Sequence, residues 1–78
     1  MLKYQLIDEG NDFVSYRYFP EGKPAYGEIT VNKFNKQLIK QTIAPDDEFK
    51  WYYLKMLKRI REFVDCGVFN KEGTIVWY

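Results

Sequence analysis

The first candidate functional site is an acidic segment whose residue spacing matches that of a calcium-binding loop. Asp8, Gly10 and Asp12 occupy alternate positions, as the first ligands of such a loop do. Phe13 stands where the loop requires a glycine for its sharp turn, and Phe19 stands where it requires a bidentate glutamate. We therefore interpret the segment as a turn between two strands, without a metal ion.

A second acidic cluster, Asp46–Glu48, offers carboxylates for general acid–base catalysis. It directly follows Pro45, and acids after a proline are typical of the first turn of a helix. The chain has no histidine, so the common general base, the usual zinc ligand and the Ser–His and Cys–His nucleophile pairs are missing. The five glycines form no phosphate-binding loop. The sequence predicts a protein that is not an enzyme and uses no cofactor.

Length and composition predict one folded domain over residues 1–78. Hydrophobic residues make up 46% of the chain and aromatic residues 19%, which favours a dense core over disorder. Twelve Lys and Arg against eleven Asp and Glu give a net charge of +1, which supplies no general attraction to nucleic acid or anionic lipid. A single cysteine, the lack of a long apolar run and the lack of a signal-peptide pattern predict a cytoplasmic protein without a membrane anchor.

The elements that must position any site are predicted from hydrophobic period and turn residues. Four short runs rich in β-branched and aromatic residues indicate strands at residues 3–7, 13–19, 26–32 and 37–43. Their short connections allow only antiparallel neighbours. A helix is expected from Pro45 to about Cys66, where Gly67 ends it, and a last strand at 74–78. The predicted fold is α+β, an antiparallel meander of about four strands with one long helix on one face and a short C-terminal strand (ββββαβ).

Period 2 assigns the side chains of the meander to two faces. Seven residues are expected to face the core: Val14, Tyr16, Tyr18, Ile29, Val31, Ile39 and Ile43. The opposite, solvent-facing side carries the polar set Lys3, Gln5, Ser15, Arg17, Glu28, Thr30, Lys40 and Thr42, together with Phe13, Phe19 and Tyr26. The last strand is expected to pair with the first strand, with another edge of the meander, or with the same segment of a second copy, and to bury Ile75 and Trp77.

The helix predicts the leading candidate for a binding site. A helical projection places most of its apolar side chains on one core-facing stripe: Phe49, Tyr52, Tyr53, Met56, Leu57, Ile60, Phe63 and Val64. Trp51 and Leu54 miss this stripe and lie among Lys55 and Lys58. We expect this surface to bind a protein partner or a second copy, because exposed tryptophan is typical of interface hot spots. The alternative is that Lys55 or the segment 68–69 covers Trp51.

Nucleic-acid binding through the solvent-facing side of the sheet is the alternative function. Residues 33–61 carry eight basic and three acidic side chains, whereas the two flanking segments are net acidic. The element order is also similar to that of small DNA-binding domains that insert a three-stranded sheet into the major groove. Lys3, Arg17, Lys33 and Lys40 would then contact phosphates or bases. Glu28 argues against this, since it lies between Arg17 and Lys40 and favours cross-strand ion pairing.

A small-molecule site is a third possibility, in a groove between helix and sheet that tyrosines would line: Tyr16, Tyr18, Tyr52 and Tyr53. Tyrosines at such positions are more often core residues whose hydroxyls reach the surface than ligand-binding residues.

Several segments resemble a group of small uncharacterised bacterial proteins of about 80 residues. The resemblance lies in the runs Gly27–Val31, Ala44–Glu48 and Gly73–Tyr78 and in the aromatic-rich helix, and it covers most of the chain. The resemblance implies a bacterial cytoplasmic accessory protein. It implies no activity, because the group has no assigned function.

Overall fold

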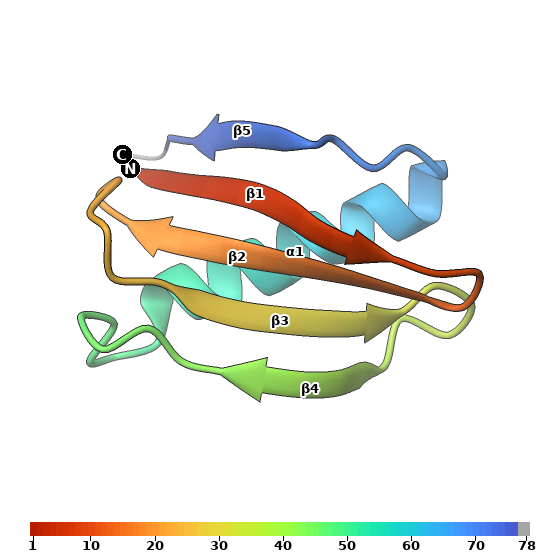
Figure 1. Ribbon diagram of the computed structural model, residues 1–78, viewed down its shortest axis with the longest axis horizontal. Helices are drawn as coiled ribbons and strands as arrows, with labels where there is room; N and C mark the ends of the chain where they lie inside the picture. Colours follow the sequence, from red (N-terminus) through yellow and green to blue (C-terminus); the bar gives the residue numbers. More distant parts are fainter. Residues whose placement is uncertain (77–78) are drawn as a thin grey trace.

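The computed structural model describes residues 1–76, which form five strands and one helix (Figure 1). In chain order the elements are β1 (Leu2–Glu9), β2 (Phe13–Pro20), β3 (Gly27–Asn32), β4 (Leu38–Thr42), α1 (Trp51–Cys66) and β5 (Glu72–Ile75). The strands form one antiparallel sheet in the order β4-β3-β2-β1-β5, and α1 packs against one face of it. The predicted α+β fold with the order ββββαβ is confirmed.

β5 closes the sheet by pairing with the outer edge of β1. Leu2 lies opposite Ile75, and Gln5 lies opposite Glu72. Ile75 is only 7% exposed, as expected for a core residue. Of the three pairings open from the sequence, the chain uses the one with its own first strand. Trp77 and Tyr78, which were also expected in this strand, lie outside the described residues.

The core lies between α1 and the sheet. Its completely buried side chains come from three strands and the helix: Leu2, Val14, Tyr16, Tyr18, Ile29, Val31, Met56 and Ile60. A cluster of three rings closes one end, since Tyr4, Tyr16 and Phe63 have centroids 5.6 to 5.8 Å apart. The faces that period 2 assigned to β2 and β3 are therefore correct.

The helix begins at Trp51, not at Pro45 as the sequence predicted. Residues 45–50 instead form two turns, closed by backbone hydrogen bonds from Asp47 to Ala44 and from Lys50 to Asp47. Lys50 has φ +60°, a left-handed conformation that separates the turns from the helix. Phe49, predicted on the core stripe, consequently lies outside the helix and is 69% exposed. Gly67 ends the helix as predicted.

β4 departs from strict alternation because the register between β3 and β4 shifts. Thr30 lies opposite Lys40, but the next residue, Val31, lies opposite Leu38. The shift leaves Ile39 as the extra residue, as in a β-bulge, so Leu38 instead of Ile39 lies opposite the buried Val31. Ile39 is 56% exposed, and its predicted place in the core is wrong. Ile43 is half-buried and packs against the core as expected.

Candidate binding surface

Three large apolar side chains are exposed together at the start of α1. Phe49, Trp51 and Leu54 are 69%, 66% and 56% exposed, and the rings of Phe49 and Trp51 lie 5.8 Å apart. Leu54 lies one helical turn from Trp51 on the same side of the helix. We call these three residues the aromatic patch. The sequence predicted Trp51 and Leu54 in it and missed Phe49, because the helix was expected to start earlier.

The patch points away from the sheet because the opposite side of α1 is committed to the core. Five helical side chains are buried there: Tyr53, Met56, Leu57, Ile60 and Phe63. The start of the helix is fixed by Asp47, whose carboxylate accepts hydrogen bonds from the backbone N–H groups of Tyr52 and Tyr53. The backbone carbonyl of Asp47 also accepts the N–H of Lys50 and so closes the turn that carries Phe49, which means that Asp47 supports both parts of the patch.

Charged side chains surround the aromatic patch. Lys55 and Lys58 are exposed along the next turns of the helix, as predicted. On the other side, Asp46 and Glu48 contribute to a notch of about 180 Å³ that Phe49 and Trp51 also line. An apolar centre with a polar rim is the usual arrangement of a protein interface.

Residues 68–69 do not cover Trp51. Val68 is itself 60% exposed, and Phe69 packs against the core, where the ammonium group of Lys33 lies 4.9 Å from its ring centroid. The alternative in which this segment shields the tryptophan is therefore wrong.

The basic residues expected to bind nucleic acid are largely engaged with other side chains. Arg17 donates a 2.9 Å hydrogen bond from Nε to Oε1 of Glu28, and its guanidinium lies 4.4 Å from the ring centroid of Tyr26. The hydrogen bond to Glu28 is the main reason that the pKa of Arg17 is raised. Lys33 forms an ion pair with Glu9.

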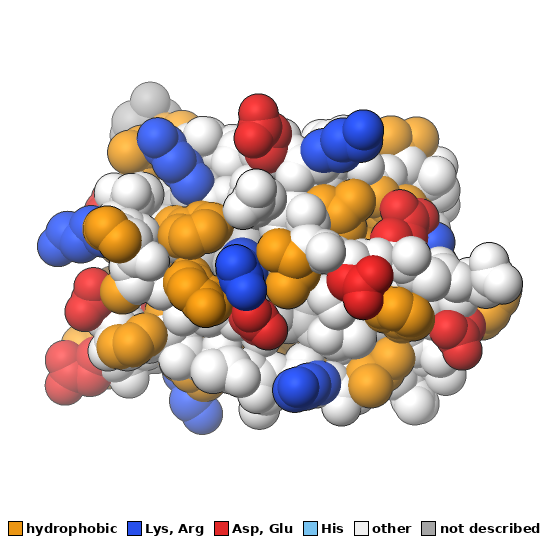
Figure 2. Space-filling view, in the orientation of Figure 1, with side chains coloured by type: hydrophobic (Ala, Val, Ile, Leu, Met, Phe, Trp, Pro, Cys, Tyr) orange, Lys and Arg blue, Asp and Glu red, His pale blue; other side chains and the backbone are white. Residues whose placement is uncertain are grey.

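Lys3 and Lys40 are on the predicted face but not near one another. Lys3 lies on β1 and Lys40 on β4, with β2 and β3 between them. Figure 2 shows this face of the sheet, on which basic, acidic and apolar side chains are mixed. The structure therefore does not gather the four predicted residues into one basic surface.

The tyrosines considered for a small-molecule groove are used inside the fold. Tyr16 is completely buried, and its hydroxyl donates to the carbonyl of Asn70 at 2.6 Å. Burial raises the pKa of Tyr16 and of Tyr18. Tyr52 donates to Glu21 at 2.7 Å, which raises the pKa of its phenol. The hydroxyls of Tyr16 and Tyr52 therefore form hydrogen bonds between different parts of the fold.

Within residues 1–76, no group of three or more His, Cys, Asp or Glu side chains could hold a metal ion. The helix of this described part is too short and too polar to cross a membrane. No family model, curated protein or solved structure matches the chain.

Proposed function

We propose that this protein is a small, non-catalytic binding module of the cytoplasm that engages another protein, or a second copy of itself, through the aromatic patch. The exposure of Phe49, Trp51 and Leu54 at one place carries this proposal. Tryptophan is enriched among the residues that contribute most to protein interfaces. Lys55 and Lys58 form the polar rim.

Burial of the aromatic patch would also contribute enough free energy to stabilise such a contact. Burying apolar surface contributes about 25 cal/mol per Å², so covering one large aromatic side chain contributes on the order of 2 kcal/mol. The net charge of +1 offers little electrostatic resistance to the approach of a second copy. The same near-neutral charge also allows a protein partner whose net charge is either positive or negative.

Sedimentation velocity over a wide concentration range tests self-association. We expect a concentration-dependent dimer for the wild type and loss of that dimer in Trp51→Ala. Phe34→Ala is the matched control, since Phe34 is 79% exposed and lies in the β3–β4 turn. That turn is next to the C-terminal end of α1, because its residue Lys36 forms an ion pair with Asp65.

Site-specific photo-crosslinking in cells tests for a different protein partner. A photoreactive residue at position 54 is expected to capture one defined protein, and the same residue at position 34 is not. The proposal fails if Trp51→Ala leaves the sedimentation profile unchanged and position 54 captures nothing more than position 34 does.

Duplex nucleic-acid binding through Lys3, Arg17, Lys33 and Lys40 remains the alternative function. The ion pairs of Arg17 and Lys33 weigh against it, because a phosphate would have to displace Glu28 or Glu9.

A further inference from the structure

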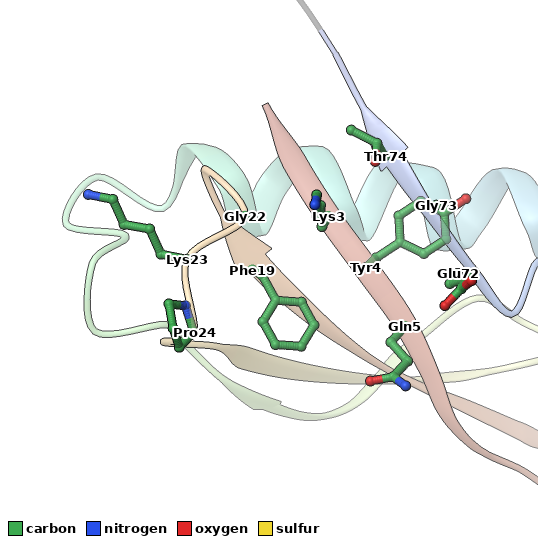
Figure 3. A pocket seen from close by; sticks show the side chains of 10 residues that line it. All are labelled: Lys3, Tyr4, Gln5, Phe19, Gly22, Lys23, Pro24, Glu72, Gly73 and Thr74. Carbon is green, nitrogen blue, oxygen red and sulfur yellow. The ribbon is translucent and has the colours of Figure 1, made fainter.

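A groove of about 570 Å³ lies on the face of the sheet that α1 leaves uncovered. It follows β1, with Phe19 of β2 on one side and β5 on the other, and Pro24 of the β2–β3 loop lies at one end (Figure 3). The aromatic patch lies at the start of α1, on the other side of the sheet. The groove is therefore a second surface that can be altered separately.

One wall of the groove is apolar. The ring of Phe19 is half-buried and lies 5.9 Å from the ring of Tyr26, which holds it in place. Phe19 pairs directly with Lys3 of β1, and Lys3 pairs in turn with Thr74 of β5. A flat apolar group placed on Phe19 would thus have an ammonium group beside it.

The other wall provides the opposite charge. Glu72 is exposed on β5, opposite Gln5, and is the diagonal neighbour of Lys3 across the two strands. Such diagonal neighbours are about 7–8 Å apart. Within residues 1–76, neither Lys3 nor Glu72 takes part in an ion pair. Lys3 and Glu72 therefore present opposite charges from neighbouring strands, each without a charged partner there, with the amide of Gln5 between them. A second lysine, Lys23, lines the loop end of the groove, and its side chain points away from Phe19 and Lys3 (Figure 3).

We propose that this groove binds a zwitterionic α-amino acid with an aromatic side chain. The carboxylate of the ligand would contact Lys3, its ammonium group would contact Glu72, and its ring would stack on Phe19. A purely anionic ligand would meet Glu72, and a purely cationic ligand would meet Lys3 and Lys23, so both are disfavoured.

An NMR titration of ¹⁵N-labelled protein with L-phenylalanine tests this site. The groove is open on one side, so we expect a dissociation constant on the order of 1 mM and saturation by about 20 mM ligand. The shifts are expected at the amides of Lys3 and Thr74 and at the side-chain amide of Gln5. Phenethylamine lacks the carboxylate and 3-phenylpropionate lacks the ammonium group, and each is expected to bind at least about fivefold more weakly.

Charge-removing variants assign the two contacts. Lys3→Gln and Glu72→Gln are each expected to weaken L-phenylalanine about tenfold. Glu72→Gln is also expected to remove the preference for L-phenylalanine over 3-phenylpropionate, which a purely structural effect would not do. Lys40→Gln changes the same sheet face outside the groove and is the matched control. Trp51→Ala is expected to leave the titration unchanged.

Three outcomes would overturn the proposal. The first is the absence of saturable shifts with L-phenylalanine. The second is equal binding of phenethylamine or 3-phenylpropionate to the wild type. The third is tighter binding of adenosine monophosphate that depends on Lys3 but not on Glu72, which would indicate a site for an anionic nucleotide.

Discussion

Tyr18 and Asp47 connect the sheet to the start of the helix through one hydrogen bond of 3.2 Å, from the phenol to Oδ2 of the carboxylate. The same oxygen accepts the N–H of Tyr53 at 2.7 Å, and Oδ1 accepts the N–H of Tyr52 at 3.2 Å. The Tyr18 hydroxyl in turn accepts the N–H of Ala44 at 2.9 Å. A single buried carboxylate therefore satisfies two of the N–H groups that a helix start leaves unpaired and ties α1 to β2.

Replacement of Asp47 should destabilise the protein because three donors would lose their acceptor. We expect Asp47→Ala to lower the free energy of unfolding by about 2 kcal/mol in urea denaturation. Asp46→Ala is the control: Asp46 is a neighbouring acid that is exposed, and its loss should cost less than about 0.5 kcal/mol. Equal effects of the two substitutions would show that the bonds of Asp47 do not anchor the helix.

The position of Asp47 also explains why the start of the helix was predicted wrongly. Acids after Pro45 favour a helix terminus in any sequence, and local rules do not distinguish a helix from two turns there. The distinction comes from Tyr18, 29 residues away in the chain, which holds the carboxylate outside the helix. Local sequence patterns do not contain that contact.

The strand faces were predictable where one side of a strand is fully covered. Val14, Tyr16 and Tyr18 alternate strictly with half-buried or polar neighbours, and helix α1 buries all three. At β4 the same rule failed for Ile39, because the shift in register depends on how β3 and β4 pair. A shift of one residue exchanges the two faces of a strand.

The two candidate surfaces also differ in how much of each could be predicted from the sequence. Trp51 and Leu54 were predictable from helical periodicity alone, since both lie outside the core-facing stripe. The groove requires Glu72 to lie beside β1, and the pairing of β5 was open among three possibilities from the sequence. The long-range pairing of β1 with β5, which runs from the Leu2–Ile75 pair to the Gln5–Glu72 pair, brings its two walls together.

The placement of β5 predicts an asymmetric response to truncation of neighbouring side chains. Ile75 is buried against the core and Val76 is 58% exposed, although the two are adjacent in the chain. We expect Ile75→Ala to lower the free energy of unfolding by about 2–4 kcal/mol and Val76→Ala by less than about 0.5 kcal/mol, as measured by urea denaturation. A similar cost for both would contradict the pairing of β5 with β1.

The buried phenols predict a loss of stability at alkaline pH. Burial raises the pKa of Tyr16 above its ordinary value of 10.0, so the folded protein keeps the proton after the unfolded chain has lost it. The contribution of the protonated Tyr16 phenol to the free energy of unfolding is complete below pH 10.0. It decreases as the pH rises from there toward the pKa of Tyr16 in the folded protein. Each such tyrosine adds a slope of about −1.4 kcal/mol per pH unit.

Tyr16→Phe isolates this contribution. The variant is expected to lose about 1 kcal/mol at neutral pH, because Tyr16 no longer donates to the carbonyl of Asn70. Above pH 10 its unfolding free energy should fall less steeply than that of the wild type, by about 1.4 kcal/mol per pH unit. Urea denaturation at several alkaline pH values measures both effects, and parallel curves for the two proteins would refute the assignment.

Titration with a mixed-sequence DNA duplex tests the sheet face as a nucleic-acid surface. Arg17 is paired with Glu28, Lys33 is paired with Glu9, and two strands, β2 and β3, separate Lys40 from Lys3. Too few free bases remain to release several counterions from a duplex, so we expect no saturable amide shifts on this face at physiological salt. Shifts that cluster on Arg17 and Lys40, weaken steeply with salt and disappear in Arg17→Ala would instead establish duplex binding and displace the aromatic patch as the leading functional surface.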